Sequence, residues 1–162
     1  MDLFGFSVAV RFLLQKGEVL AYGWHWDKAR AERHAAALAS HHGIPAEPAR
    51  DRGLEGWLAK RLRAVVLEGE RFSLPSHPYR DRAVYEALLE VPRGETLTYG
   101  ELAKRAGLPY PRVLAALLKN PFQVLVPCHR LVTKKGTLMG FYPLGARVKR
   151  RLLELEGVRL EE

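Results

Sequence analysis

Two neighbouring segments at the start of the chain, residues 6–14 and 18–26, are rich in apolar and β-branched residues. Lys16-Gly17 lies between them. A short link that contains glycine, placed between two such runs, is typical of a β-hairpin. We therefore expect two antiparallel strands joined by a tight turn near Gly17.

Helical spacing of apolar residues follows the predicted hairpin. A helix capped by Asp27 is predicted to run to about residue 41, because aspartate is a favoured N-cap residue. Apolar residues at helical spacing predict a second helix over residues 54–67. The segment 72–77 looks extended, so we place a boundary there between two domains, residues 1–75 and 76–162.

The second half of the chain is predicted to be mostly helical, with helices over residues 78–89 and 144–155 near its two ends. Thr98 and Glu101 have the spacing of a capping box, which marks the start of a helix. Pro111 suits the first turn of another short helix. Two short helices joined by a tight turn predict a helix-turn-helix, and a purely structural pair of helices is the alternative.

Net charge adds a candidate partner. The 162 residues carry a formal net charge of +8, and residues 96–151 hold 11 Lys and Arg against one acidic residue, Glu101. Because ordinary surfaces mix both signs, this span favours nucleic acid as a partner. Arg112 supports this interpretation, since a cation in the first turn of a helix opposes the helix dipole. Ala115 and Ala116 are small enough for that helix to approach a groove closely.

The cysteine content and the lengths of the apolar runs indicate the cellular compartment in which the protein works. A single cysteine excludes an internal disulfide framework and a zinc site built from several thiolates. Asp2 and Arg11 are not typical of a signal peptide, and no apolar run is long enough for a membrane span. We expect a reducing, cytoplasmic location.

The single cysteine, Cys128, follows Pro127 at the end of an apolar run and precedes His129 and Arg130. Only the thiolate form of cysteine is a good nucleophile, and nearby positive charge or a proton acceptor favours it. Cys128 is therefore a candidate nucleophile, although a lone cysteine is more often a small buried hydrophobic residue.

These blocks together resemble the methylated-DNA–protein-cysteine methyltransferases, also called O(6)-alkylguanine-DNA alkyltransferases. Pro127-Cys128-His129-Arg130, preceded by Asn120-Pro121, is similar to their active-site signature. Thr98-Tyr99-Gly100-Glu101-Leu102-Ala103 resembles the first helix of their helix-turn-helix, and residues 68–75 and 152–157 resemble their interdomain connector and C-terminal helix. The resemblance implies an α/β fold: a small ribonuclease-H-like N-terminal domain, then a mainly helical domain that binds DNA.

A reaction is also implied by the resemblance. The protein would bind double-stranded DNA from the minor groove, rotate an alkylated guanine out of the stack, and transfer the alkyl group from the six-position oxygen to Cys128. The transfer would be irreversible, so each molecule would act once. The resemblance implies no cofactor and no metal, and a monomer is expected.

The resemblance implies roles for the matching residues around the sulfur. Cys128 would be the nucleophile, His129 its base acting through a water, and Glu156 the group that orients His129. Asn120 would brace the loop behind the cysteine. Tyr99 would press on the 3′ phosphate and supply a proton to the departing guanine.

Further residues would contact DNA and the base. Arg112 would be the finger that fills the gap left by the extruded guanine. The expected DNA-binding set is Tyr99, Arg112, Ala115, Ala116 and Arg130. The expected substrate-binding set is Tyr142, Leu131 and Pro143.

The chain departs from the family pattern after Tyr142, where Pro143 and Leu144 replace a small serine and glycines. Proline has neither a backbone N–H nor a hydroxyl, so a donor to the guanine oxygen is missing. An alternative is therefore an alkyltransferase-like protein that binds alkylated guanine and passes it to excision-repair proteins without transferring the alkyl group. A helix-turn-helix regulator and a thiol protease with a Cys–His pair are weaker alternatives.

Overall fold

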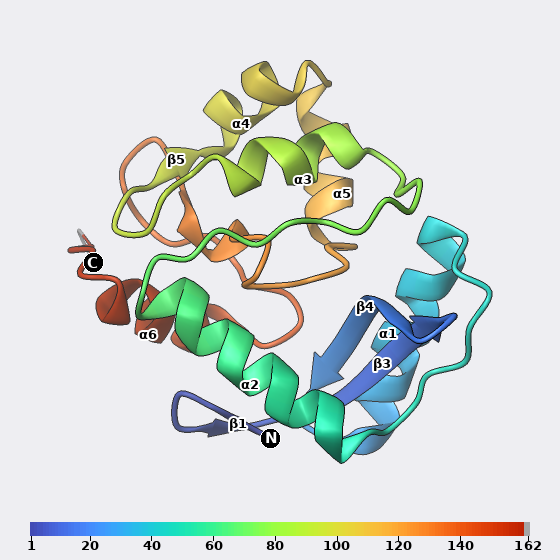
Figure 1. The fold of residues 1–162 in the computed structure, drawn as a ribbon. Coiled ribbons are helices and arrows are strands. Elements are labelled where there is room, and N and C mark those ends of the chain that lie inside the picture. Colours follow the sequence, from blue (N-terminus) through green and yellow to red (C-terminus); the bar gives the residue numbers. More distant parts are fainter. Residues whose placement is uncertain (161–162) are drawn as a thin grey trace.

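The computed structural model describes residues 1–160 and has a mixed α/β fold (Figure 1). In chain order, these residues form β1 (Asp2–Leu3), β2 (Phe6–Ser7), β3 (Ala9–Gln15), β4 (Glu18–His25), α1 (Lys28–His42), α2 (Arg52–Val66), α3 (Arg82–Leu89), β5 (Leu97–Thr98), α4 (Tyr99–Ala106), α5 (Tyr110–Leu117), the 3-10 helix η1 (Cys128–Arg130), β6 (Leu131–Val132) and α6 (Ala146–Leu155). The strands pair as β1–β2 and β3–β4, both antiparallel, and β5–β6, which is parallel. Within the described range, no helix is both long enough and apolar enough to cross a membrane.

The β3–β4 hairpin confirms the predicted N-terminal strands. Lys16 and Gly17 form its turn, with φ values of 52° and 78°. The first strand begins later than predicted, because Phe6–Ser7 turns back to pair with β1. The ribonuclease-H-like sheet is not confirmed. In the described N-terminal part, the hairpin is extended only by an isolated bridge between Phe12 and Ala49.

Helix α1 packs against the hairpin and has the two ends that the sequence predicts. The Asp27 side chain accepts a hydrogen bond from the backbone N–H of Arg30, and Gly43 ends the helix in a left-handed conformation with φ of 62°. The helix and β4 touch at Gly23, where a Cβ atom would lie 2.4 Å from the backbone nitrogen of Ala35. Only glycine permits so close an approach.

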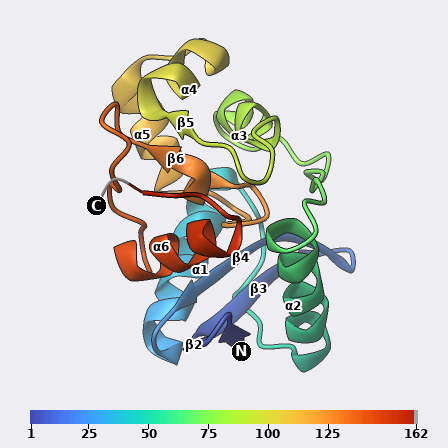
Figure 2. The same cartoon turned by 90° about the vertical axis from the view of Figure 1, so that its left-hand side faces the viewer.

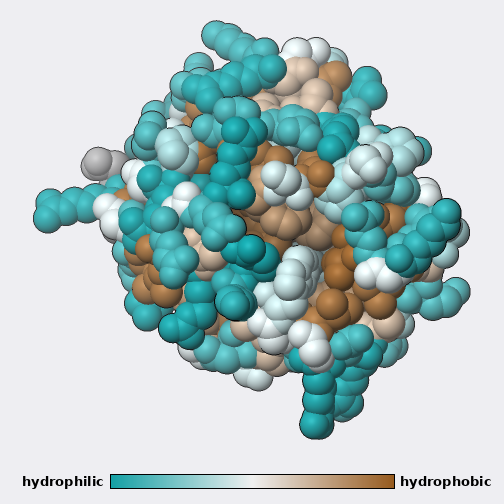
Figure 3. Space-filling view, in the orientation of Figure 1, coloured by the Kyte–Doolittle hydropathy of each residue, from teal (hydrophilic) through white to brown (hydrophobic). Residues whose placement is uncertain are grey.

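Helix α2 lies on the other side of the hairpin, so β3 and β4 are held between two helices (Figure 2). It begins earlier than predicted, because the Asp51 side chain accepts a hydrogen bond from Leu54 N and caps it. Its buried side chains Leu58 and Leu62 belong to the same core as Phe12 of β3. A long connector then runs from α2 to α3 across the face shown in Figure 1. On that face, hydrophilic side chains surround a patch of apolar surface near the centre (Figure 3).

Helices α3, α4 and α5 pack together at the opposite end of the molecule (Figure 1). Thr98 and Glu101 form the predicted capping box, with both backbone–side-chain hydrogen bonds at 3.1 Å. Helix α3 starts later than predicted, at Arg82, because Asp81 has a left-handed conformation with φ of 55°. The two halves meet where the Tyr22 backbone N–H donates to Pro121 O at 3.0 Å. The division at residue 75 stays a prediction.

Candidate active site

A compact loop after α5 brings Cys128 to the site. The Asn120 side chain, 2% exposed, closes this loop: its Nδ2 donates to Val126 O at 2.9 Å, and its Oδ1 accepts from Phe122 N at 3.0 Å. The loop leads directly into η1, whose first residue is Cys128. The structure therefore places Asn120 where the sequence expects a brace behind the cysteine.

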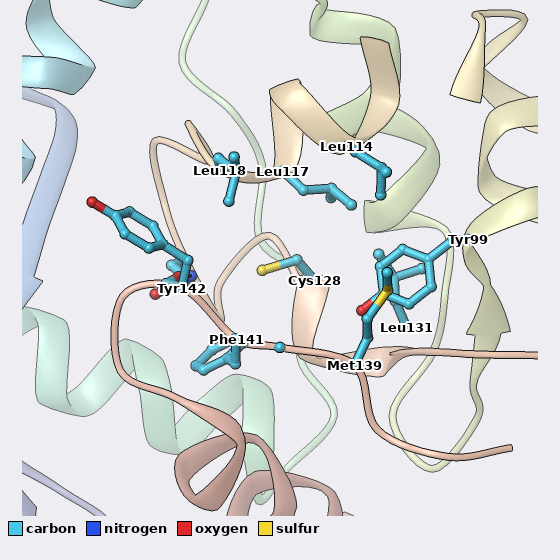
Figure 4. A pocket seen from close by; sticks show the side chains of 11 residues that line it. Tyr99, Leu114, Leu117, Leu118, Cys128, Leu131, Met139, Phe141 and Tyr142 are labelled. Atoms are coloured by element: carbon cyan, nitrogen blue, oxygen red, sulfur yellow. Dashed lines mark hydrogen bonds between the residues drawn. The ribbon is translucent and has the colours of Figure 1, made fainter. Parts of the chain in front are cut away.

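The Cys128 sulfur faces a pocket of about 310 Å³ (Figure 4). Helix α5 and the segment before α6 supply most of its walls. Its lining residues are Tyr99, Leu114, Leu117, Leu118, Gln123, Cys128, Leu131, Met139, Gly140, Phe141 and Tyr142. Cys128 is 8% exposed. A planar apolar group can thus reach the sulfur while water is largely excluded.

Two residues of η1 and one at the end of α6 form a cluster of titratable side chains. The carboxylate of Glu156 accepts from Arg130 Nε at 2.9 Å and from Arg130 Nη2 at 2.6 Å, and its Oε1 lies 3.2 Å from His129 Nε2. All three residues are buried. Burial raises the pKa of Glu156, but the neighbouring His129 and Arg130 outweigh this effect, so the pKa is lowered. Burial lowers the pKa of His129, and Glu156 counteracts it only in part.

The thiol of Cys128 does not have the low pKa that its sequence neighbours suggest. Burial raises its pKa, and this effect outweighs the hydrogen bond from Asn120 and the charge of Lys149. Arg130 cannot supply the expected positive charge, because its guanidinium is paired with Glu156. The expectation of a thiolate favoured by Arg130 is therefore wrong, and the resting group is a thiol.

Lys149 is a site residue that the sequence analysis missed. It is 0% exposed, its Nζ donates to Tyr99 Oη at 2.9 Å, and it lies 5.3 Å from the centre of that ring. Burial raises the pKa of Tyr99. The amphipathic pattern of α6 does contain the signal, because residue 149 falls on the apolar side of the helix, next to Val148 and Leu152, which are also buried.

The structure separates the predicted DNA-binding residues into two groups. Arg112 and Ala115 are exposed on α5, and Arg112 pairs with Asp81 at 2.7 Å. Ala116 is 0% exposed and packs in the core, so it is not available to a groove. Arg130 is also buried, and besides Glu156 it donates to Val91 O at 2.7 Å. The expected DNA contact of Arg130 is thus replaced by an internal structural contact.

Two of the three predicted substrate-binding residues line the pocket. Leu131 and Tyr142 line the pocket, and Pro143 is not among the lining residues. Gln123, which lines the pocket as its one side-chain amide, had no signal in the sequence. Across the described residues, no group of three His, Cys, Asp or Glu side chains is arranged to hold a metal ion.

Comparison with known proteins relates this site to one family. A family model described as the DNA-binding domain of 6-O-methylguanine DNA methyltransferase matches residues 80–158. A methylated-DNA–protein-cysteine methyltransferase of Methanothermobacter thermautotrophicus is 46% identical over 80 residues, which cover 49% of this chain and 45% of that protein. The chain therefore spans only about half the length of this curated relative.

Solved structures extend the likeness to the whole chain. The O6-methylguanine-DNA methyltransferase of Pyrococcus kodakaraensis matches with a TM-score of 0.74 and 28% identity, over 98% of this chain and 96% of that one. The O6-methylguanine methyltransferase of Mycobacterium tuberculosis matches with a TM-score of 0.52 and 35% identity, over 67% of this chain and 68% of that one. The structure of Mycobacterium tuberculosis OGT in complex with DNA matches with a TM-score of 0.50 and 35% identity, over 61% of this chain and 63% of that one. The chain belongs to the O6-methylguanine-DNA methyltransferase family.

The different environments of two arginines generate a stability prediction. Arg130→Met leaves the buried Glu156 carboxylate without its main partner, so we expect the free energy of unfolding to fall by about 3–5 kcal/mol. Arg112→Ala removes an exposed partner of Asp81 and should cost less than about 1 kcal/mol. Urea denaturation measures both. In the double variant Arg130→Met/Glu156→Gln, part of the loss should return, and equal losses for the two arginine variants would contradict the assignment.

Proposed function

We propose that this protein repairs DNA by moving an alkyl group from the six-position oxygen of guanine to the sulfur of Cys128. The observation that carries the proposal is the position of the Cys128 sulfur, which faces a largely apolar pocket (Figure 4). His129, the next residue of η1, lies 3.2 Å from the Glu156 carboxylate. The names of the relatives support the same chemistry. Double-stranded DNA that contains alkylated guanine is the proposed substrate, and the protein would act as a monomer.

The reaction is a displacement at the alkyl carbon. A bond forms between Cys128 Sγ and this carbon, the bond from the carbon to the guanine oxygen breaks, and the electron pair of that bond leaves with guanine. The proton of the thiol passes to His129, through a water, and a proton must reach the departing guanine. The product is a thioether, which water does not reverse, so each molecule reacts once.

The surroundings of the thiol explain why a base is needed. Because burial raises the pKa of Cys128, the resting thiol is protonated at neutral pH and protected from other electrophiles. Burial lowers the pKa of His129, so its imidazole is neutral and can accept a proton at pH 7. Glu156 stays ionised and stabilises the imidazolium once it forms.

Tyr99 is placed to supply the proton that the departing guanine needs. It lines the pocket, and its hydroxyl oxygen accepts a hydrogen bond from Lys149. Because Lys149 occupies the oxygen as an acceptor, the O–H of Tyr99 is free to donate towards the base. The positive charge of Lys149 also stabilises the tyrosinate during the transfer.

DNA would meet the protein at α4 and α5, acting as a helix-turn-helix in the minor groove. The reacting carbon is inaccessible inside a duplex, so the guanine must leave the stack. Arg112, at the first turn of α5, would fill the gap, which requires its pair with Asp81 to break. The DNA complex of the Mycobacterium tuberculosis relative supports DNA as a partner, and the exposed cation Arg112 favours this surface.

The direct test mixes the protein with an oligonucleotide duplex that contains O6-methylguanine and weighs the protein by mass spectrometry. We expect a stable gain of one methyl group, located on the peptide that contains Cys128. Cys128→Ala should bind the lesion and gain no mass. If the wild-type protein binds the lesion but stays unmodified, it is a lesion-binding protein, and transfer is ruled out.

The opposite pKa shifts of Cys128 and His129 give different pH profiles for transfer. In the wild-type protein, a neutral His129 takes the proton, so we expect a single-turnover rate that is nearly constant between about pH 7 and 8.5. In His129→Gln only the spontaneously ionised thiol reacts. Because the pKa of Cys128 is raised, this rate should rise about tenfold per pH unit across the range. Parallel profiles for the two proteins would exclude His129 as the base.

The pair between Arg112 and Asp81 predicts opposite effects on lesion binding. Arg112→Ala should weaken binding to the lesion duplex by about tenfold or more, as expected for loss of roughly 1–3 kcal/mol. Asp81→Asn frees the arginine and should tighten binding by up to about fivefold, since a pair whose cation is exposed to solvent contributes roughly 0.2–1 kcal/mol. Fluorescence anisotropy at one fixed salt concentration measures both. With Arg112 already replaced, Asp81→Asn should have no further effect, and equal tightening there would refute the coupling.

A further inference from the structure

Tyr142 forms one wall of the pocket, and its side chain is only partly packed. The residue is 51% exposed, and Figure 4 shows its hydroxyl pointing away from Cys128. The segment that carries it, between β6 and α6, forms no strand or helix of its own. Contacts with other parts of the chain must therefore fix this wall.

The main contact comes from Gln123. Its Nε2 donates to the backbone carbonyl of Tyr142, and the side chain is 4% exposed. An amide in such a largely apolar pocket is costly unless both of its ends are hydrogen-bonded. The second end, Oε1, accepts from the indole Nε1 of Trp24 at 2.6 Å. Gln123 thus joins the pocket wall to strand β4 of the N-terminal hairpin.

The hairpin also holds Gln123 by its backbone and touches Tyr142 through α1. The Tyr22 hydroxyl donates to the Gln123 carbonyl oxygen. On α1, the ring of His34 lies edge-on to Tyr142, with 5.8 Å between ring centres. His34 is in turn tied to Trp24, whose backbone nitrogen lies 3.0 Å from His34 Nδ1. The two hydrogen bonds to Gln123 come from residues 99 and 101 positions earlier in the chain. Together with the His34 contact they reach Gln123 and Tyr142, which both line the pocket.

We propose that Gln123 is a positioning residue through which the N-terminal hairpin sets the place of Tyr142, and hence the size of group that can reach the Cys128 sulfur. On the proposed function, on which this consequence rests, the Trp24–Gln123–Tyr142 link makes the enzyme select among alkyl groups. An intact link favours small groups such as methyl, because the wall stays close to the sulfur. A broken link lets the wall move outwards and admits bulkier groups such as benzyl.

Two variants break the link at different ends. Trp24→Phe keeps an aromatic ring and removes the indole N–H, and Gln123→Met keeps the length of the side chain and removes its amide. Tyr79→Phe is the matched control, because it removes another buried hydrogen bond to the same hairpin, from Tyr79 Oη to Leu20 O at 2.5 Å, away from the pocket. Melting temperatures of all variants identify effects of general destabilisation.

The first measurement needs neither DNA nor transfer. Cys128 is the single cysteine, so its reaction rates with iodoacetamide and with the bulkier N-benzylmaleimide report access to the pocket directly. We expect each link variant to raise the ratio of the maleimide rate to the iodoacetamide rate about tenfold, which corresponds to about 1.4 kcal/mol. The double variant should equal the single ones, since both remove one link. The proposal would be overturned if the link variants left this ratio of rates unchanged, or if Tyr79→Phe raised it as much as they do.

The second measurement compares single-turnover transfer from O6-methylguanine and O6-benzylguanine in duplex DNA at saturating protein. The link variants should slow methyl transfer about tenfold and change benzyl transfer less than about twofold, while affinity for unmodified DNA stays constant. Equal slowing of both substrates would refute the effect on selectivity. If the wild-type protein transfers neither group but the reagent ratio shifts, the positioning role stands and the proposed function fails.

Discussion

The buried carboxylate of Glu156 is the interaction on which the site depends. It lies at the end of α6 and binds Arg130 at 2.6 Å and 2.9 Å, while His129 lies 3.2 Å away. Arg130 also donates to Val91 O, so the pair ties the end of α6 to η1 and to the turn after α3. A buried charge must be paired, and removal of either partner leaves an ion that the interior cannot solvate. The orientation of His129 is therefore fixed by the same contact that holds the C-terminal helix.

This arrangement changes where the reactivity of Cys128 comes from. Arg130 follows it closely in sequence, but its charge is neutralised by Glu156. Burial raises the pKa of Cys128 and outweighs the groups that favour the thiolate, which are Asn120, Lys149, the Val124 backbone and Gln123. A protonated resting thiol is slow to react with stray electrophiles, which would suit the single, irreversible reaction proposed above.

The sequence predicts local structure well where the signal and its effect lie within a few residues. Asp27 and Gly43 delimit α1, and Thr98 and Glu101 form the capping box. Around Cys128, the resemblance supplied the candidates His129, Glu156 and Asn120, whose catalytic roles stay predictions. The environment of Arg130 could not be predicted, because its partner Glu156 lies 26 residues away in the sequence. A basic residue in a basic stretch of sequence is usually exposed to solvent. Gln123 was missed because long-range packing makes it important and no local pattern marks it. Lys149 was missed although the amphipathic pattern of α6 puts it on the apolar side of the helix.

The contacts of the N-terminal hairpin explain how two chain halves with separate sequence signals form one site. Trp24 and Tyr22 bind the side chain and the backbone of Gln123, which belongs to the loop closed by Asn120 just before Cys128. Because the Gln123 amide is hydrogen-bonded at both ends, to the buried Trp24 indole and to the Tyr142 carbonyl, a shift of this loop would leave a polar group unpaired. The matched family segment, residues 80–158, contains the reacting groups, and the hairpin outside it fixes one wall of the pocket around them. The chemistry and the shape of the site are thus set by different parts of the chain, so a substitution in the hairpin can alter the pocket without changing any reacting group.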